Sequence, residues 1–293
     1  MMHKSGFVNI IGHPNIGKST LLNTLVGERM AIISPKPQTT RHRIMGILNG
    51  EDFQIVFSDT PGLIQDPAYK MQEIMNQSIT SSFEDADLIL LMTEPHDTFP
   101  KDHHWLVHLN RTKTPVFLII NKIDLFDDGT ILNTISTWQP VLEFDECVPI
   151  SALKGKNTER LLELILSAMP EGPEYYPKDR LSDRPERFFA AEIIREQVYF
   201  QYREEIPYSV QIEVESFKED DNILRIEADI YVAKQSQKSI IIGKDGLSIK
   251  KLGIYSRKNL ENFFRKKIYL HLYVRVKKNW RNNEQALRRF GYR

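Results

Sequence analysis

The chain has 293 residues, of which 41% are hydrophobic and 27% are charged, and its 39 Lys and Arg balance its 39 Asp and Glu. This composition is typical of a soluble globular protein with one large or two ordinary domains. A single cysteine, Cys147, excludes an internal disulfide and favours the reducing cytoplasm. No run of about eighteen apolar residues predicts a membrane span, and the first residues lack the apolar segment of a secretory signal.

Charge is distributed unevenly along the chain. Residues 1–177 carry 14 Lys and Arg against 22 Asp and Glu, whereas residues 178–293 carry 25 against 17. From residue 234 to the end there are 17 basic and 3 acidic residues, a local net charge of +14. This density of positive charge is self-repulsive and favours nucleic acid as a partner, although a solvated basic surface also fits.

Short apolar strands alternate with helical segments through the first part of the chain. The predicted strands are residues 7–12, 53–59, 88–92, 115–121 and 147–151. The predicted helices are residues 19–26, 68–82, 102–110 and 157–169. This alternation indicates an α/β domain, in which a mostly parallel sheet carries helices on both faces.

The segment GHPNIGKST, residues 12–20, joins the first predicted strand to the first predicted helix. Its spacing fits Gly-x-x-x-x-Gly-Lys-Ser, the phosphate-binding loop, whose backbone N–H groups surround phosphate oxygens. The two glycines permit close approach of the backbone, Lys18 can reach the β- and γ-phosphates, and Ser19 can bind Mg²⁺. The alternative is an ordinary strand-to-helix turn. The expected phosphate site comprises Gly12, Asn15, Gly17, Lys18, Ser19 and Thr20.

Two further segments are expected at the Mg²⁺ ion and the γ-phosphate. Residues 34–43, SPKPQTTRHR, have the composition of a mobile loop, and Thr40 is the candidate that completes the Mg²⁺ shell. In the alternative, Thr40 merely helps to begin a strand. The segment DTPG ends a predicted strand, so that Asp59 can reach Mg²⁺ through a water and the Gly62 N–H can contact the γ-phosphate. The expected metal ligands are Ser19, Thr40 and Asp59.

Two later strand ends predict a guanine site. The segment NKID follows the apolar strand PVFLII, at the carboxyl end where ligands bind in open α/β sheets. Asp124 can accept hydrogen bonds from the guanine N1–H and 2-amino group, Asn121 is expected to hold neighbouring loops together, and Lys122 is expected to lie along the base. A surface turn is the alternative for this segment alone. Ser151, Ala152 and Leu153, after the strand CVPI, can supply a backbone N–H to the guanine oxygen.

A proline-rich segment, MPEGPEYYP, separates this domain from a second pattern. We expect a GTP-binding domain over residues 1–172, a linker over 173–186 and an RNA-binding domain over 187–293. The second domain is predicted to contain a helix at 185–203, strands at 208–217, 223–232 and 268–276, and two helices within 236–264.

The two helices of that last segment flank Gly243-Lys244-Asp245-Gly246, which has the form of the KH loop that clamps single-stranded nucleic acid. Taken alone, Gly-x-x-Gly is more often an ordinary helix–helix turn. Ile240, Ile241, Ile242 and Ile249 are expected to form an apolar floor for bases, although core packing is the alternative for some of them. The expected RNA site comprises Ile242, Gly243, Lys244, Asp245, Gly246, Lys250 and Lys251.

Taken in order, GHPNIGKS, QTTRHR, DTPG, NKID and SAL resemble the translation-factor-like class of small GTPases. Joined to IIIGKDGLSIKKLG and the ending KNWRNNEQALRRFGYR, they resemble the bacterial Era GTPase family over essentially the whole chain. The resemblance implies a P-loop GTPase domain followed by a smaller α+β type II KH domain. It further implies GTP, GDP and Mg²⁺ as ligands, slow GTP hydrolysis, binding of small-subunit ribosomal RNA near its 3′ end, and assistance in 30S subunit maturation.

The same resemblance implies a monomer in the cytoplasm, with peripheral association with the inner membrane in some family members. Leu63 follows DTPG, where Ras-like GTPases use a water-orienting glutamine. Related GTPases bind K⁺ through the asparagine that corresponds to Asn15, and this ion can supply positive charge at the β–γ bridge. Asn15 as a plain loop-forming residue is the alternative. The expected catalytic residues are Asn15, Lys18 and Thr40.

Two other functions compete with a GTPase switch. A metabolic phosphotransferase using GTP is disfavoured because no second substrate pocket with acid–base spacing is visible after residue 172. An RNA-binding protein with a degenerate nucleotide fold is disfavoured because all the motif residues of the nucleotide site are present.

Overall fold

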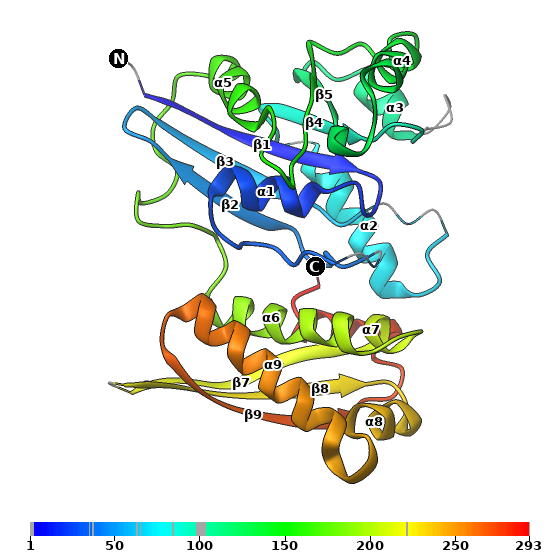
Figure 1. The fold of residues 1–293 in the computed structure, drawn as a ribbon, viewed down its shortest axis with the longest axis vertical. Coiled ribbons are helices and arrows are strands. Elements are labelled where there is room, and N and C mark those ends of the chain that lie inside the picture. The colour runs from blue at the N-terminus through cyan, green and yellow to red at the C-terminus, as the bar shows by residue number, and fades with distance from the viewer. Residues whose placement is uncertain are drawn as a thin grey trace. The chain divides into compact units, whose positions relative to one another are not determined.

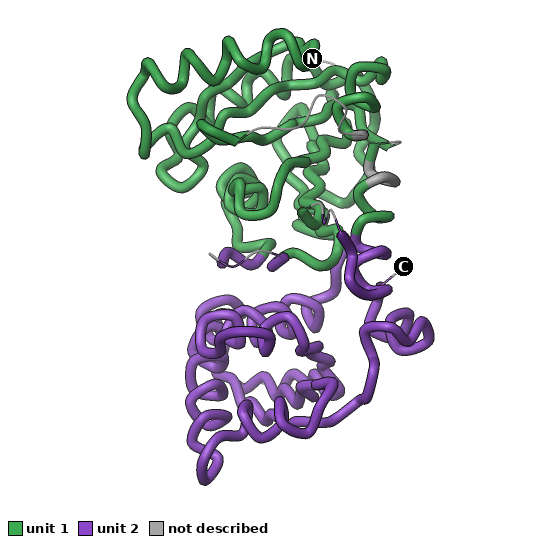
Figure 2. The backbone as a smooth tube through the Cα atoms, turned by 90° about the vertical axis from the view of Figure 1, so that its right-hand side faces the viewer, with its two compact units in different colours: residues 1–31, 40–63, 76–183 green, residues 32–39, 64–75, 184–293 purple. Residues whose placement is uncertain are grey.

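The computed structural model describes residues 3–34, 36, 38–62, 64, 66–83, 85–97, 104–220 and 222–292, without the side chains of 80–82 and 104. Leu63 lies outside the described residues. The chain divides into two compact units (Figure 2). The first unit comprises residues 1–31, 40–63 and 76–183, and the second comprises 32–39, 64–75 and 184–293.

The first unit is built on a six-stranded sheet of order β2-β3-β1-β4-β5-β6 (Figure 1). Its strands are β1 Lys4–Gly12, β2 Ile44–Asn49, β3 Phe53–Asp59, β4 Leu88–Thr93, β5 Val116–Ile120 and β6 Glu146–Pro149. All neighbours pair in parallel except β2 and β3, which are antiparallel. The predicted mostly parallel sheet is therefore confirmed, with one antiparallel edge strand added.

Helices cover both faces of this sheet. They are α1 Lys18–Val26, α2 Lys70–Ser82, α3 His104–Leu109, α4 Asp128–Trp138 and α5 Thr158–Ala168, with a short 3₁₀ helix, η1, at Ile123–Leu125. Side chains of α2, α3 and α4 share one apolar cluster with β1, β4 and β5. Helix α1 packs against β1, β2 and β3 and contacts α5. The helix α2 continues across the division between the units, since residues 70–75 belong to the second and the rest to the first.

Two elements of the first unit were not predicted from the sequence. Strand β2 contains Gly46, where a Cβ atom would lie within 2.9 Å of Leu22 and Val26. The glycine that weakens the strand pattern is thus the residue that lets α1 pack closely. Helix α4 is rich in Thr, Asn, Ser and Ile, which are modest helix formers, but Asp127 caps it by accepting a hydrogen bond from the Thr130 N–H at 2.9 Å.

The proline-rich segment after α5 hydrogen-bonds to the sheet of the first unit. The Gln54 side chain donates to the Tyr176 carbonyl at 2.7 Å and accepts from the Tyr175 and Tyr176 N–H groups. Farther along, Ser182 forms a bridge with Gly46 of β2. Residues up to 183 therefore extend along the β2–β3 edge.

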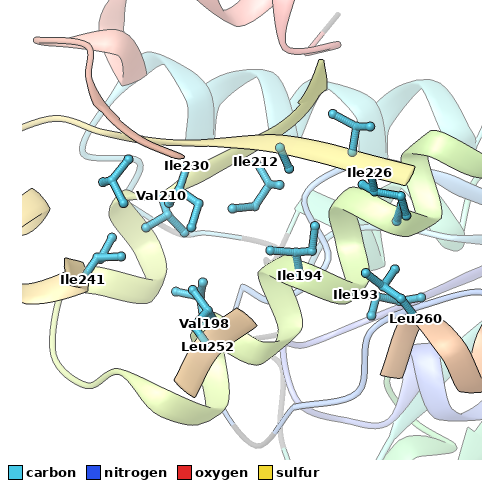
Figure 3. Packing of buried hydrophobic residues seen from close by; sticks show 14 of the residues in the cluster. Ile193, Ile194, Val198, Val210, Ile212, Ile226, Ile230, Ile241, Leu252 and Leu260 are labelled. Atoms are coloured by element: carbon cyan, nitrogen blue, oxygen red, sulfur yellow. The ribbon is translucent and has the colours of Figure 1, made fainter. Parts of the chain in front are cut away.

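In the second unit, one face of a three-stranded sheet packs against three helices, at residues 186–201, 235–242 and 247–264. Its strands are β7 Gln211–Asp220, β8 Ile223–Val232 and β9 Lys267–Val276, in the order β7-β8-β9, with β7 antiparallel and β9 parallel to β8. Its helices are α6 Glu186–Gln201, α7 Ile206–Ser209, α8 Gln235–Ile242, α9 Leu247–Phe264 and α10 Glu284–Arg289, with 3₁₀ helices η2 at Lys244–Gly246 and η3 at Trp280–Asn282. Figure 3 shows the core, where side chains such as Ile194, Val198 and Ile230 meet.

Two short segments from the first half of the chain belong to this second unit. In residues 32–39, the Lys36 ammonium donates to the Tyr199 and Tyr202 carbonyls at the end of α6, and the Tyr199 hydroxyl donates to the Gln38 carbonyl at 3.0 Å. In residues 64–75, apolar side chains pack with the C-terminal segment in one cluster, which comprises Ile64, Met71, Met75, Tyr231, Trp280, Ala286, Leu287, Phe290 and Tyr292.

Candidate nucleotide site and nucleic-acid groove

The loop between β1 and α1 has the backbone geometry that its glycines allow. Gly12 and Gly17 have φ angles of 149° and 103°, and Asn15 is also left-handed at 64°. At Gly17 a Cβ atom would lie 2.3 Å from the Asn121 side-chain nitrogen. The loop therefore requires glycine for close approach as well as for backbone angle.

Lys18 extends back over this loop. Its ammonium donates to the Gly12 and His13 carbonyls, each at 2.9 Å. Burial lowers the pKa of Lys18 to about 8, and the charge of Asp59 opposes that shift. Burial likewise raises the pKa of Asp59, opposed first by Lys18 and then by hydrogen bonds from Ser19 and Thr40. An anionic phosphate beside Lys18 and a cation beside Asp59 favour the charged form of each residue.

The three expected metal ligands meet at one point. The Ser19 hydroxyl donates to Asp59 Oδ2 at 2.6 Å, and the Thr40 hydroxyl donates to the same oxygen at 3.2 Å. The two hydroxyl oxygens lie 2.9 Å apart. Asp59 Oδ1 is buried and has no hydrogen-bond partner among the described residues. Clustered hard oxygen donors with an unsatisfied carboxylate oxygen fit Mg²⁺.

The DTPG segment lies directly against the phosphate loop. The Thr60 hydroxyl donates to the Ile10 carbonyl at 3.0 Å, which attaches the end of β3 to β1. At Gly62 a Cβ atom would lie 2.8 Å from the backbone nitrogen of Pro14. Because no side chain intervenes, the Gly62 backbone is held beside the loop that is expected to carry the phosphates.

Asn121 links the phosphate loop to the two segments of the guanine site. Its side-chain nitrogen donates to the Ile16 carbonyl at 2.8 Å, and its side-chain oxygen accepts from the Ala152 N–H at 2.9 Å. The Ile123 N–H donates to the Ile150 carbonyl at 3.2 Å and draws the same two segments together. The arrangement fixes three loops around one point at the carboxyl edge of the sheet.

The other residues expected at the guanine base differ in exposure. Asp124 lies exposed in η1, and Lys122 forms an ion pair with Glu94. Ser151 is fully buried and its hydroxyl accepts from the Lys154 N–H at 3.2 Å, whereas Leu153 is 73% exposed. The Ser151 N–H donates to the Lys156 carbonyl and the Ala152 N–H donates to the Asn121 side chain, so a backbone N–H contact to the guanine oxygen stays a prediction.

The second unit has a groove of about 540 Å³ between α9 and β9, with the Gly-x-x-Gly turn at the start of α9. The lining residues are Ile223, Ile249, Lys250, Gly253, Ile254, Arg257, Ile268, Tyr269, Leu270, His271 and Leu272. Gly243 and Gly246 in the turn have φ angles of 72° and 74°, and the Asp245 φ of 51° is also left-handed. Lys244 and Asp245 are exposed. An apolar groove with a cationic rim fits a strand of unpaired nucleotides.

The structure distributes the other expected RNA residues differently. Lys250 lines the groove, whereas the Lys251 ammonium lies 5.9 Å from the centre of the Tyr255 ring, outside the groove lining. Of the four isoleucines only Ile249 lines the groove, whereas Ile241 is fully buried in the core, Ile242 packs against that core and Ile240 is exposed. RNA contacts by all of the expected residues stay predictions.

Sequence reasoning did not identify the opposite wall of the groove. That wall is β9. Its alternating pattern IYLHLYVRV predicted a strand but gave no indication that this strand lies beside α9. On α9, Gly253 and Ile254 were also not identified. The spacing of Lys250, Gly253, Ile254 and Arg257 on one side of a helix was the available signal.

Comparison with known proteins matches both parts of the chain to known families. A family model for 50S ribosome-binding GTPases matches residues 7–122, and a KH-domain model matches 205–281. The chain is 47% identical over 295 positions to GTPase Era of Caldanaerobacter subterraneus subsp. tengcongensis, covering all of this chain and 99% of the relative. It is 45% identical to GTPase Era of Clostridium botulinum strain Eklund 17B, with the same coverage.

Two solved structures share the fold over 99% of both chains. An Era variant of Aquifex aeolicus bound to GDP and AlF₄⁻ is 39% identical, with a TM-score of 0.92. An Era complex with MgGDPNP and nucleotides 1506–1542 of 16S ribosomal RNA is 38% identical, with a TM-score of 0.91.

Proposed function

Because the chain belongs to the Era family of GTPases, we propose that it hydrolyses GTP with Mg²⁺ and binds the 3′ end of small-subunit ribosomal RNA during 30S subunit maturation. The observation that carries the nucleotide half is the meeting of Ser19, Thr40 and Asp59 beside the phosphate loop. The family relationship and this intact site disfavour both a degenerate nucleotide fold and a metabolic phosphotransferase.

Each part of the nucleotide site has a distinct task in this proposal. Backbone N–H groups of residues 12–20 and the Lys18 ammonium hold the phosphates, and Ser19, Thr40 and Asp59 hold Mg²⁺, which neutralises charge on the β- and γ-phosphates. Asp124 reads the guanine edge while Asn121 fixes the loops. A K⁺ ion at Asn15 would add positive charge at the β–γ bridge, and the left-handed φ of Asn15 also suits the simpler role of a loop-forming residue.

The RNA half rests on the groove between α9 and β9. In this proposal the turn at Lys244 and Asp245 follows the RNA backbone, and Lys250 and Arg257 contact phosphates. The related Era complex that contains 16S ribosomal RNA nucleotides supports this ligand class. Phosphate contacts position the strand, and base edges presented to the groove give sequence preference.

The switch behaviour rests on residues 32–39 and 64–75. The first segment runs directly into Thr40, and the second follows the DTPG segment, yet both pack within the second unit. Lys36 and Gln38 hydrogen-bond to α6, and the Gln72 side chain donates to that of Gln38 at 3.1 Å. A rearrangement of Thr40 or Gly62 on loss of the γ-phosphate would therefore displace residues 32–39 or 64–75, which pack within the RNA-binding unit.

Calorimetry on the full chain can test this coupling. RNA affinity is measured with and without a non-hydrolysable GTP analogue, and the affinity for that analogue is measured with and without 16S 3′-end RNA. We expect each ligand to change the affinity for the other by the same factor, about fivefold or more. Coupling indistinguishable from zero would leave two independent binding modules and end the switch proposal.

A matched pair of variants sharpens the experiment. Lys36→Ala removes the hydrogen bonds to α6 and is expected to reduce the coupling factor while each separate affinity stays within about twofold. Lys113→Ala removes an exposed lysine elsewhere and is expected to leave the coupling unchanged. Equal coupling in both variants would remove Lys36 from the proposal.

Three further features stay predictions of the family resemblance: a cytoplasmic location, a monomeric state and peripheral association with a membrane. Among the helices that the structure describes, none has the length and apolar character to cross a membrane.

A further inference from the structure

The outer face of β9 carries an unusual row of aromatic side chains. Along β9, the even-numbered residues from Ile268 to Val276 pack toward the helices, so the odd-numbered ones lie on the other face of the sheet. On that outer face are Tyr269, His271 and Tyr273, which we name the aromatic stripe. Both tyrosines are 46% exposed, and the His271 and Tyr273 rings lie 4.2 Å apart.

The aromatic stripe continues the groove. Tyr269 and His271 are themselves among the groove-lining residues, and β9 is an edge strand with no further strand beside it in this sheet. A strand of RNA that leaves the groove across β9 would therefore meet the stripe, because the groove and the stripe share Tyr269 and His271. A KH groove holds about four nucleotides, so the ribosomal RNA 3′ end proposed above extends beyond it.

Basic groups flank the aromatic rings. The Arg225 guanidinium lies 5.6 Å from the centre of the Tyr269 ring, and that of Arg275 lies 5.8 Å from the Tyr273 ring. The nearby acids Asp220 and Asp229 form ion pairs with these same arginines. Glu227, directly opposite His271, is exposed and places negative charge at the middle of the stripe. Each arginine thus already has a carboxylate partner, and what the stripe offers a nucleic acid is its exposed ring faces.

We propose that the aromatic stripe is a stacking platform for unpaired bases of the RNA strand that continues from the groove. This inference rests on the proposed RNA-binding function. Tyrosine and histidine rings stack on any base, so the platform adds affinity and length to the bound strand with little sequence preference. Continuity with the groove favours RNA over a protein partner at this face.

RNA length is the variable that tests the platform. The full-length protein is titrated with a five-nucleotide and a fifteen-nucleotide single-stranded RNA, both taken from the 16S 3′ end. We expect the wild-type protein to bind the longer RNA more tightly. The double variant Tyr269→Ala/Tyr273→Ala removes two stacks and should bind the longer RNA at least about 25-fold more weakly, since each lost stack costs roughly five- to 150-fold in affinity. Tyr273→Ala alone, at a residue outside the groove lining, should weaken binding of the longer RNA at least about fivefold and leave binding of the shorter RNA within about twofold of wild type.

Two control variants separate stacking from other effects. Tyr269→Phe/Tyr273→Phe keeps both rings and is expected to bind both RNAs like the wild-type protein. Tyr255→Ala removes a tyrosine of α9 that is also 46% exposed but does not line the groove, and is expected to have no effect.

The outcomes distinguish the two proposals. If wild type binds neither RNA, the proposed RNA function fails and the platform fails with it. If wild type binds both RNAs with equal affinity, or if Tyr273→Ala weakens both equally, RNA binding stands and the platform is overturned. Weak binding by the phenylalanine variant would likewise overturn stacking.

Discussion

The nucleotide site and the RNA groove differ in how far their charged residues are buried. Lys18 and Asp59 are 6% and 0% exposed, and Asn121 holds three loops through two buried hydrogen bonds. In the groove, by contrast, Lys250 and Arg257 are exposed, and the walls are apolar side chains of a helix and a strand. A buried, pre-organised polar site discriminates one small ligand. Exposed cations attract a polyanion, but the affinity for that polyanion falls as the salt concentration rises.

The comparison predicts its largest effect at Lys18. Lys18→Ala removes charge-assisted contacts to two phosphates, so affinity for GTP and GDP should fall about 100-fold, as measured by calorimetry. RNA affinity without nucleotide should stay within about twofold of wild type, because the groove shares no residue with the loop. Nucleotide binding at wild-type strength would refute the phosphate-loop assignment.

Salt should affect the two sites unequally. Single-stranded binding weakens with a logarithmic slope of about −0.7 per phosphate, so four contacts predict roughly a 50-fold loss of RNA affinity between 50 and 200 mM KCl. GTP affinity at fixed Mg²⁺ should change far less, since the charged residues Lys18 and Asp59 beside the phosphate loop are buried.

Lys244→Glu should reduce the slope of log RNA affinity against log salt concentration by about one. A flat salt profile for RNA would contradict the electrostatic description of the groove.

A smaller effect is expected at the guanine edge. Asp124→Asn replaces one acceptor oxygen by a donor NH₂ group, so GTP affinity should fall about tenfold and affinity for xanthosine triphosphate should rise. Competition binding between the two nucleotides measures this change. Asp128→Asn, a similar change at an exposed residue in the first turn of α4, serves as the control and should alter neither affinity. Unchanged GTP affinity in Asp124→Asn would remove it as the guanine reader.

The same contrast explains what could be predicted from the sequence. Gly12 and Gly17 are required by backbone angles, and Asp59 and Asn121 stand at or directly after strand ends, so local chemistry and spacing locate them. The side chains of Ser19, Thr40 and Asp59 meet because three consecutive motifs converge on one edge of a parallel sheet.

Features that depend on tertiary packing could not be predicted in this way. Strand β2 is stabilised by pairing with β3 and by α1 over Gly46, neither of which is visible in its own six residues. The groove needs α9 and β9 side by side, and periodicity alone could not show that Ile241 faces the core while Ile249 lines the groove. The assignment of residues 32–39 and 64–75 to the second unit has no local sequence signal at all.

That assignment has a consequence for any attempt to divide the protein. The polypeptide passes between the units five times, so cutting it after residue 183 does not release two complete folding units. A fragment that ends there retains Ile64, Met71 and Met75 but loses Trp280, Leu287 and Phe290, which bury them. The fragment would expose an apolar strip and tend to self-associate, and the remaining C-terminal piece would lack part of its own core. The path of the chain therefore argues against dividing the protein into two independent halves at this point.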